Sequence, residues 1–331
     1  MRDVDISCNF QEKTMNTSSE FNCEQLFLSQ GPYWHVCTPG SRTGLIFPRT
    51  EDFAFGMTLS AVCSVLASGI RIITFELMSN HLHFLMAGDK TSAEEYFRMF
   101  RKKLMRYYSE KGMKLDFSGF DCSLIPVDSL KSIRNEIVYI NRNGYVVNPG
   151  HTPFSYPWGA GRYYFNSIQD RKKFGDLSLK EKRHMCRCKD IFIPDEYQIS
   201  NYDFISPASF CNIQFGMSLF RDSHQYFSSL SKNVEAYSEI AGRLNDKEFL
   251  TDDEMFSAAL RICKSLYNCS SPSALNSLDK IDAANRLHYD YHASNNQIRR
   301  ILAMSQYEID SLFPLSKKHP DGIPGREKAG I

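Results

Sequence analysis

Two histidines separated by one residue, His81 and His83, are the pair whose type and spacing point most directly to chemistry. Alternate side chains of a strand share one face, so both imidazoles would lie together while Leu82 points into the core. Two imidazole nitrogens at this spacing can hold one divalent ion and leave coordination positions open for substrate oxygens. A His-x-His pair alone is more often structural, so the interpretation depends on its surroundings.

A tyrosine and an asparagine downstream form a second pair. Tyr139 and Asn143 lie four residues apart in a segment of helical periodicity, so their side chains point the same way. The apolar face of this helix carries Ile133, Ile137 and Ile140, which leaves Tyr139 near the edge of that face, where it could meet the metal. A phenol has a pKa of about 10, so it is a poor nucleophile at neutral pH without help.

The apolar pattern predicts the elements that must position these pairs. The order is strand, helix, strand, strand, helix, strand, helix, over residues 33–37, 51–67, 71–77, 81–86, 92–111, 122–127 and 128–143. This order favours an antiparallel sheet with helices packed on it, an α+β fold. Ser92, with Glu95 three residues later, is the predicted N-cap of the fifth element.

Composition and periodicity divide the chain into four parts. Residues 1–30 are polar and predict an N-terminal arm, and residues 31–170 hold the α+β pattern. Residues 171–200 form a basic connector, and residues 201–331 predict a helical, all-α C-terminal domain.

The end of this last part carries helix-capping signals. They are Thr251 with Glu254, Ser294 with Gln297, and Ser305 with Glu308. Three short helices near 279–291, 295–303 and 306–313 have the spacing of a helix-turn-helix whose last helix begins with Gln306 and Tyr307. A small bundle for packing or dimerisation is the alternative. The predicted shared core is Ile281, Ala284, Leu287, Ile298, Ile301, Leu302 and Ile309.

Charge is balanced over the whole chain but not along it. The formal net charge is +1, whereas residues 130–190 carry twelve Lys or Arg against five Asp or Glu. Residues 98–111 carry six basic residues against one Glu. Such patches can follow a phosphate backbone, although each could also be a solvated helix face.

Other features bound the class of protein. No apolar run approaches the roughly 18 residues of a membrane span, and the N-terminus lacks a secretory layout, so a cytoplasmic protein is predicted. The ten cysteines are scattered as reduced core residues are. His184 with Cys186 and Cys188 could begin a zinc site, but no second paired motif supplies the missing ligand.

Three ordered motifs give a family resemblance over about residues 31–166. The stretch Leu77-Met78-Ser79-Asn80-His81-Leu82-His83-Phe84-Leu85 resembles the signature of IS200-like transposases, and within them the REP-associated tyrosine transposases. Glu136-Ile137-Val138-Tyr139-Ile140-Asn141-Arg142-Asn143 resembles the family's helix that carries the nucleophilic tyrosine. Tyr156-Pro157-Trp158 followed by Arg162 and Tyr163 is similar to the motif that ends the catalytic domain.

The resemblance implies a ferredoxin-like HUH nuclease core spanning residues 31–170. It implies that Tyr139 is the nucleophile and that His81, His83 and Asn143 hold Mg²⁺ or Mn²⁺. Attack would leave a 5′-phosphotyrosine link and a free 3′-hydroxyl, which allows strand transfer without ATP. The implied substrate is single-stranded or hairpin DNA, and the implied assembly is a homodimer.

Candidate DNA contacts follow from charge and position. They are Arg98, Arg101, Lys102, Arg106, Arg142, Arg162, Gln306 and Tyr307. Seventeen tyrosines compete with one another for the nucleophilic role, and Tyr145, Tyr107 and Tyr108 are the nearest rivals of Tyr139. The family usually has proline after the position of Asn143, whereas this chain has Gly144.

Three other functions remain open at this point. A replication initiator of the HUH type would share the chemistry, but we find no Walker-type glycine loop. A domesticated DNA-binding protein could keep the fold without cleavage. A zinc hydrolase would need a further ligand near His81, and the one nearby acid, Glu76, is predicted to lie on the opposite face.

Overall fold

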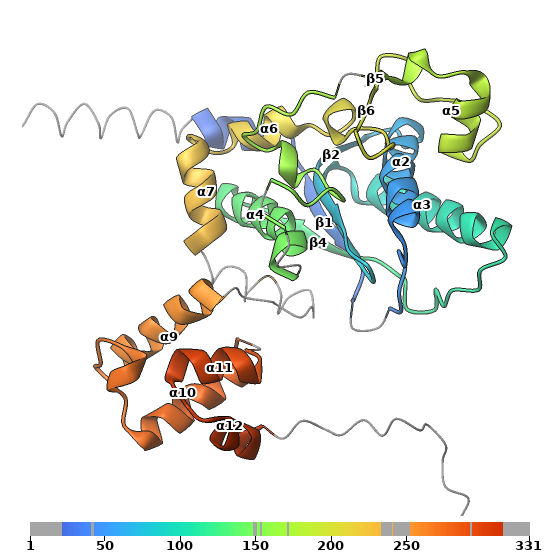
Figure 1. Cartoon of the computed structure of the whole chain (residues 1–331). Coiled ribbons are helices and arrows are strands. Elements are labelled where there is room, and N and C mark those ends of the chain that lie inside the picture. The colour runs from blue at the N-terminus through green and yellow to red at the C-terminus, as the bar shows by residue number, and fades with distance from the viewer. Residues whose placement is uncertain are drawn as a thin grey trace, which may run out of the picture. The chain divides into compact units, whose positions relative to one another are not determined.

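The computed structural model describes residues 22–313, except 41–42, 148–150, 153, 171, 233–239, 241–251 and 292. The chain divides into two compact units, Met1–Phe249 and Leu250–Ile331. The first unit holds the sheet and both predicted chemical pairs (Figure 1). Among the described residues, none of the helices has the length and apolar character to cross a bilayer.

Four antiparallel strands form the central sheet, in the order β2-β3-β1-β4. Their bounds are Tyr33–Cys37 for β1, Ile70–Leu77 for β2, Leu82–Gly88 for β3 and Ser123–Val127 for β4. The three helices that alternate with them are Thr50–Leu66 for α2, Lys90–Glu110 for α3 and Leu130–Val147 for α4. The predicted α+β class and the predicted order of these seven elements are confirmed.

Helices α2 and α3 cover one face of the sheet, and α4 covers the other (Figure 1). The α3 side is built from aromatic rings. Phe75 of β2 stacks on Phe84 of β3 with ring centroids 5.1 Å apart, and Phe84 meets Tyr96 of α3 edge-on at 5.3 Å. Offset and edge-on ring pairs of this kind favour a tightly packed layer.

The opposite face of the sheet carries polar side chains under α4. Cys37 of β1 and Glu76 of β2 both pair in register with His83 of β3. Residues that pair across strands share a face, so all three side chains lie on one side of the sheet. His35 and Thr74, each two residues along its strand, lie on that side too.

Helix α4 is buried more completely than its sequence indicates. Ile133, Ile137 and Ile140 are fully buried, as predicted. Tyr139, however, is only 2% exposed, so its predicted place at the edge of the apolar face is wrong. Segments that follow α4 cover it from outside: Asn141 donates from Nδ2 to the hydroxyl of Tyr226, in helix α7 (Ser223–Lys232), at 3.0 Å.

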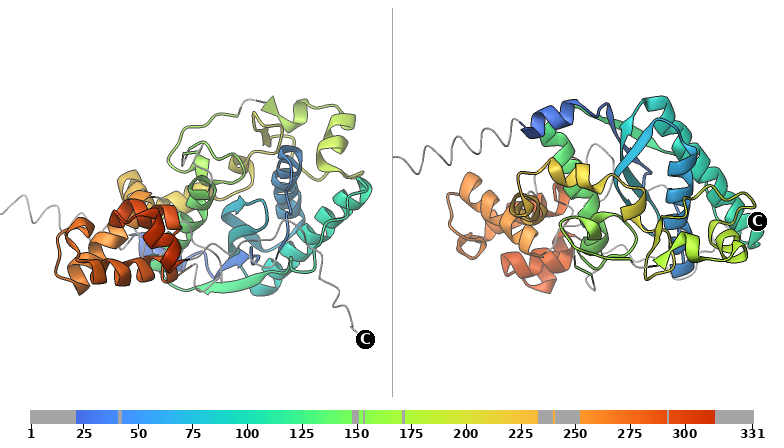
Figure 2. Two further views of the ribbon diagram at one scale, coloured as in Figure 1. Left: turned by 60° about the horizontal axis from the view of Figure 1, so that its bottom comes forward. Right: turned by 90° about the horizontal axis from the view of Figure 1, so that it is seen from above.

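The predicted connector 171–200 is a folded part of the first unit. It contains β5 (Lys172–Lys173), a 3-10 turn Phe174–Asp176, α5 (Leu179–Cys186) and β6 (Gln198–Ile199). Its buried residues pack on Ala61 and Val62 of α2 and form a core cluster separate from the main one. Figure 2 shows this lobe beside α2 in both views.

The boundary predicted at residue 201 lies instead near residue 250. Helices α6 (Ile213–Ser218) and α7 (Ser223–Lys232) follow the 3-10 turn Pro207–Ser209 and pack on the first unit. The amide of Asn212 donates to the carbonyl of Ile72 at 2.7 Å, and the ring of Tyr226 stacks on that of Tyr164. A further 3-10 turn, Gly161–Tyr163, lies between α4 and the connector.

The structure also differs from the sequence-based prediction at the start of α3 and in the N-terminal arm. Asp89, not Ser92, caps α3: its carboxylate accepts from the amide of Ser92 at 2.9 Å. Residues 22–28 of the predicted arm are helical, and Phe27 packs on Tyr33 with ring centroids 5.0 Å apart. Residues 1–21 lie outside the described part of the chain.

The described residues of the second unit form helices joined by turns and loops, and none of them forms a strand. Its helices are Asp252–Leu266 (α9), Ser277–Tyr289 (α10), Asn295–Leu302 (α11) and Gln306–Leu312 (α12), with a 3-10 turn Pro272–Ala274. The capping boxes of Ser294 and Ser305 are confirmed, whereas Thr251 lies outside the described residues. Six of the seven predicted core residues are buried, and Ile281 is not, at 38% exposed.

Candidate functional site

A buried chain of three polar side chains lies between the sheet and α4. His35 Nδ1 is 2.7 Å from Glu136 Oε2, and His35 Nε2 is 3.0 Å from His83 Nδ1. The side chains of His35 and Glu136 are 0% and 2% exposed, and His83 is 1% exposed. Hydrogen bonds to one ring nitrogen fix the orientation of an imidazole, so this chain holds His83 in place.

His81 lies just before β3, in the turn that precedes the strand, and is partly buried. Its Nδ1 is 2.8 Å from the Oδ1 of Asn80, whose Nδ2 donates to the carbonyl of Gly40 at 2.8 Å. The rings of His81 and His83 are perpendicular, with centroids 4.9 Å apart. The structure therefore brings the two predicted metal ligands together.

Tyr139 of α4 lies beside both histidines of the sheet. Its ring meets that of His83 edge-on with centroids 5.6 Å apart, and that of His35 edge-on at 6.1 Å. These ring contacts form because α4 packs on the face of the sheet that carries the imidazoles of His35 and His83. The predicted nucleophile and the predicted metal ligand His83 are thus direct neighbours.

Asn143 follows Tyr139 by one helical turn and is partly buried. Its Nδ2 is buried and has no hydrogen-bond partner in the described part of the chain. An unsatisfied buried N–H group costs free energy, and it would be satisfied by a hydrogen-bond acceptor rather than by a cation.

The donor set can be tested against an ion. Imidazole nitrogens bind divalent ions at about 2.1 Å, so two perpendicular rings on one ion have centroids roughly 5 Å apart. The 4.9 Å between His81 and His83 fits this geometry. A second group, His35, Cys37 and His83, is fully buried, and its ligand atoms lie within 4.8 Å of one another, so this group could also hold a metal ion.

Sequence reasoning missed His35, Cys37 and Glu136. A signal exists for each: His35 and Cys37 alternate on the first strand, and Glu136 precedes Tyr139 by three residues on the helix. What the sequence lacks is the strand order, which places β1 directly beside β3. Without it, nothing connects His35 to His83.

Glu76 lies on the same face as His83, so its predicted place on the opposite face is wrong. Alternation along one strand does not determine the face of Glu76, because Glu76 and His83 lie on two paired strands. Glu76 Oε1 accepts from the amide of Gly144 in α4 at 2.7 Å, and Oε2 is buried without a hydrogen-bond partner among the described residues. Burial raises the pKa of Glu76 well above its usual value.

Gly144 makes this contact possible. A Cβ at this position would lie 2.1 Å from Glu76 Oε1 and 2.2 Å from the ring of Tyr156. The glycine that departs from the family pattern is therefore required by the close approach of β2 to α4. Burial also raises the pKa of the Tyr156 phenol.

The predicted DNA contacts on α3 lie at the surface. Arg98 and Arg106 are 77% and 75% exposed, and each pairs with a glutamate of the same helix. Arg101 pairs with Asp121 at 3.2 Å, and Lys102 is exposed. All four side chains are on the face of the sheet opposite Tyr139.

The other two predicted arginines of this unit are less accessible. Arg142 is 2% exposed, which removes it from any phosphate-binding surface of this structure. Arg162 is partly buried and lies over the ring of Tyr202 at 5.3 Å. Its Nε and Nη1 are buried without hydrogen-bond partners among the described residues.

The remaining predictions fall outside this site. Gln306 and Tyr307 begin α12 in the second unit; Tyr307 is 83% exposed, and Gln306 donates to Asp310 at 2.9 Å. Cys186 is buried in the core of the connector lobe, which raises its pKa to about 12 and disfavours the thiolate that zinc requires. The described residues hold no metal-binding group around His184.

No family model, curated protein or solved structure matches this chain.

Proposed function

We propose that this chain cleaves single-stranded DNA and transfers the cut strand, with Tyr139 as the nucleophile. The observation that carries the proposal is the contact of three rings: His81 and His83 at 4.9 Å, and His83 and Tyr139 at 5.6 Å. A phenol next to two imidazoles that would hold a metal ion is an arrangement suited to phosphotyrosine chemistry.

The fold supports the same proposal. A β-α-β-β-α-β order with the sheet order β2-β3-β1-β4 is that of a ferredoxin-like, split βαβ core. The family resemblance of the three sequence motifs implies such a core for an HUH nuclease. The tyrosine helix follows the last strand, as the motif order requires.

The chain's own residues would act as follows. The hydroxyl oxygen of Tyr139 attacks the phosphorus; the new oxygen–phosphorus bond forms as the bond to the 3′-oxygen breaks. The phenolic proton passes, net, to the departing 3′-oxygen. His81 and His83, with the amide oxygen of Asn143, would hold Mg²⁺ or Mn²⁺, which supplies stabilisation of the charge that develops on the phosphate.

Burial sets a condition on this chemistry. Tyr139 and His83 are 2% and 1% exposed, so a DNA strand reaches them only after residues around them have moved. The cleavage-competent state therefore differs from the one described, and DNA binding must stabilise it.

A labelled single-stranded hairpin DNA, incubated with the protein and Mn²⁺, tests the proposal. Wild type should form a covalent adduct that survives denaturation, and Tyr139→Phe should form none. Tyr108→Phe is a matched control, because Tyr108 is a buried tyrosine, 1% exposed, on α3. An adduct of undiminished yield in Tyr139→Phe contradicts the proposal.

A DNA-binding protein of the same fold without cleavage is the second candidate. Burial of Tyr139 and the hydrogen bond of His83 to His35 favour it, because both groups are engaged in packing. This candidate predicts binding of the same hairpin with no adduct in any metal.

A further inference from the structure

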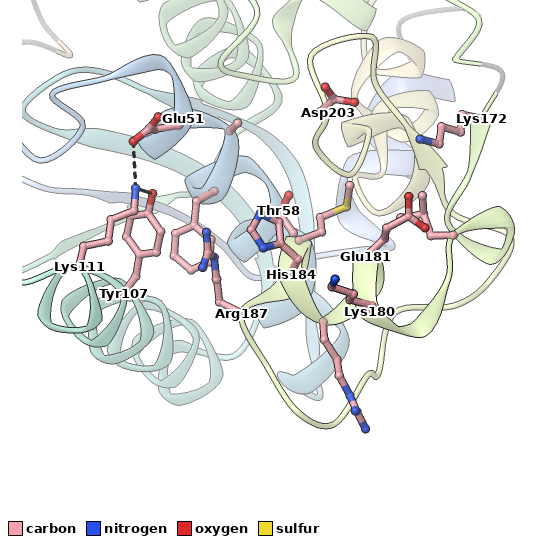
Figure 3. A pocket seen from close by; sticks show the side chains of 15 residues that line it. Glu51, Thr58, Tyr107, Lys111, Lys172, Lys180, Glu181, His184, Arg187 and Asp203 are labelled. Carbon is pink, nitrogen blue, oxygen red and sulfur yellow. Dashed lines mark hydrogen bonds and ion pairs between the residues drawn. The ribbon is translucent and has the colours of Figure 1, made fainter.

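Two adjoining cavities run between α2 and α3 on one side and the connector lobe on the other. Their volumes are about 990 and 530 Å³, and both are lined by Phe55, Tyr107, Arg183 and Arg187. We call this surface the α3–α5 groove. Figure 3 shows its larger part, with Tyr107 of α3 and Lys111, which follows α3, facing His184 and Arg187 of the lobe.

The lobe's wall of the groove is held in a fixed position. Ser178 and Glu181 form a capping box that starts α5, and Cys186 at its end is buried against α2. Lys182 pairs with Asp195 at 2.7 Å and so ties α5 to the following loop. Lys180 and Arg183, three residues apart on α5, lie on one side of the helix, and Arg187 follows its last residue; all three line the groove.

Six cations line the groove without an ion pair in the described part of the chain. They are Lys103, Lys172, Lys180, Arg183, Arg187 and Lys189. All except the half-buried Lys103 are exposed. Five of the six lie on the lobe, and Lys103 lies on α3. Cations that line one cleft reinforce each other's field, because the protein around them has a low dielectric constant.

Most of the acids in the groove are already engaged. Glu51 pairs with Lys111 at 3.1 Å, and Glu110 pairs with Arg106 at 2.7 Å. Glu181 accepts from the amide and hydroxyl of Ser178 in the capping box. Glu181 keeps its charge because Ser178 is neutral, so Glu181, Asp190 and Asp203 oppose the six cations and the groove carries an excess of positive charge.

We propose that the α3–α5 groove binds the phosphate backbone of a single strand of DNA. The cations are spread along the groove rather than gathered around one point, which suits a chain of phosphates better than a single one. The aromatic residues of its floor, Phe55 and Tyr107, are 8% and 3% exposed, so binding should be independent of base sequence.

This binding site is distinct from the cleavage site, because α2 and α3 lie on the face of the sheet opposite Tyr139. The inference rests on the proposed function only in naming DNA as the polyanion. It assigns the groove the task of holding a strand whose cut end lies elsewhere on the protein.

Fluorescence anisotropy with a labelled 30-nucleotide oligothymidylate tests the proposal. The groove variant is the triple substitution Lys180→Gln, Arg183→Gln and Arg187→Gln. We expect its affinity to fall at least tenfold, and the slope of log K against log salt to shrink by about 2, since each lost phosphate contact removes roughly 0.7. The control replaces three exposed lysines outside the groove with Gln: Lys114, Lys131 and Lys264. The control should bind within twofold of wild type.

Three results would overturn the proposal: unchanged affinity in the groove variant, an equal loss in the control, or equally strong competition by polyglutamate of the same charge. Thermal melting of each variant excludes unfolding as the cause, and the single substitution Lys180→Gln, at an exposed site, gives a smaller loss if the triple variant unfolds. Tyr139→Phe separates the two proposals: it should bind the oligonucleotide like wild type even if no adduct ever forms.

Discussion

The Nε2 atom of His35 lies 3.0 Å from the Nδ1 atom of His83, and Glu136 contacts the other nitrogen of His35 at 2.7 Å. A carboxylate thus acts on His83 through a second imidazole. Partners of this kind orient a metal-binding histidine, and their loss commonly weakens metal binding.

Glu136→Ala should therefore weaken Mn²⁺ binding by about 10- to 100-fold, because His83 loses its fixed orientation. Isothermal titration calorimetry with Mn²⁺ measures the change. Glu95→Ala is the control, since Glu95 is exposed and pairs only with Arg98 among the described residues. Equal Mn²⁺ affinity in Glu136→Ala and wild type would show that the chain does not position His83.

Asp52 of α2 gives a prediction about how the stability of the fold depends on pH. Its side chain is fully buried and accepts from Arg49, Tyr107 and Lys111 at 3.0, 2.8 and 3.2 Å. Burial raises the pKa of Asp52, but these donors outweigh it and the pKa is lowered. A lowered pKa contributes stability above the unfolded value of about 3.9, and this stability is lost as the pH falls through the folded value.

Asp52→Asn should lower the free energy of unfolding by about 1–3 kcal/mol at pH 7. This range is below that for breaking a fully buried ion pair, because Arg49 is partly exposed. The gap between variant and wild type should shrink as the pH falls below about 4. Urea unfolding at a series of pH values measures it. A gap that stays constant down to pH 3 would contradict the role of the charge.

The sequence predicts the secondary structure of the first unit well, because alternating and helical apolar patterns are local properties. The sequence does not predict features that depend on strand register or on which segments pack over a helix. The face of Glu76 depends on its pairing with His83, and a register is not visible in one strand. The burial of Tyr139 and Arg142 depends on what packs outside α4, which comes from residues much later in the chain.

The connector, residues 171–200, is another part of the fold that the sequence does not predict. Its basic composition predicts a connector, yet Phe174, Leu177 and Cys186 are buried against α2. The apolar residues are too few and too widely spaced to give a periodic signal, so only the tertiary contact reveals the lobe. The groove it forms could not be found from the sequence.

Gly144→Ala should destabilise the first unit by about 1–3 kcal/mol, because a Cβ would overlap Glu76 Oε1 and the ring of Tyr156. Chemical denaturation measures the loss. Gly112→Ala is not a suitable control, since its φ of +68° adds backbone strain. Gly44→Ala is suitable, because no atom lies within 4 Å of the added Cβ. A loss in Gly144→Ala no larger than in Gly44→Ala would contradict the close approach.

The most direct test of the central claim is to identify the residue that becomes joined to DNA. The adduct formed with hairpin DNA and Mn²⁺ is digested with nuclease and protease, and the modified peptide is sequenced by mass spectrometry. The account predicts a nucleotide remnant on Tyr139, within the peptide that contains Glu136 and Asn143. A remnant on Tyr145 or on any other residue, or no adduct at all from protein that binds the hairpin, would contradict it.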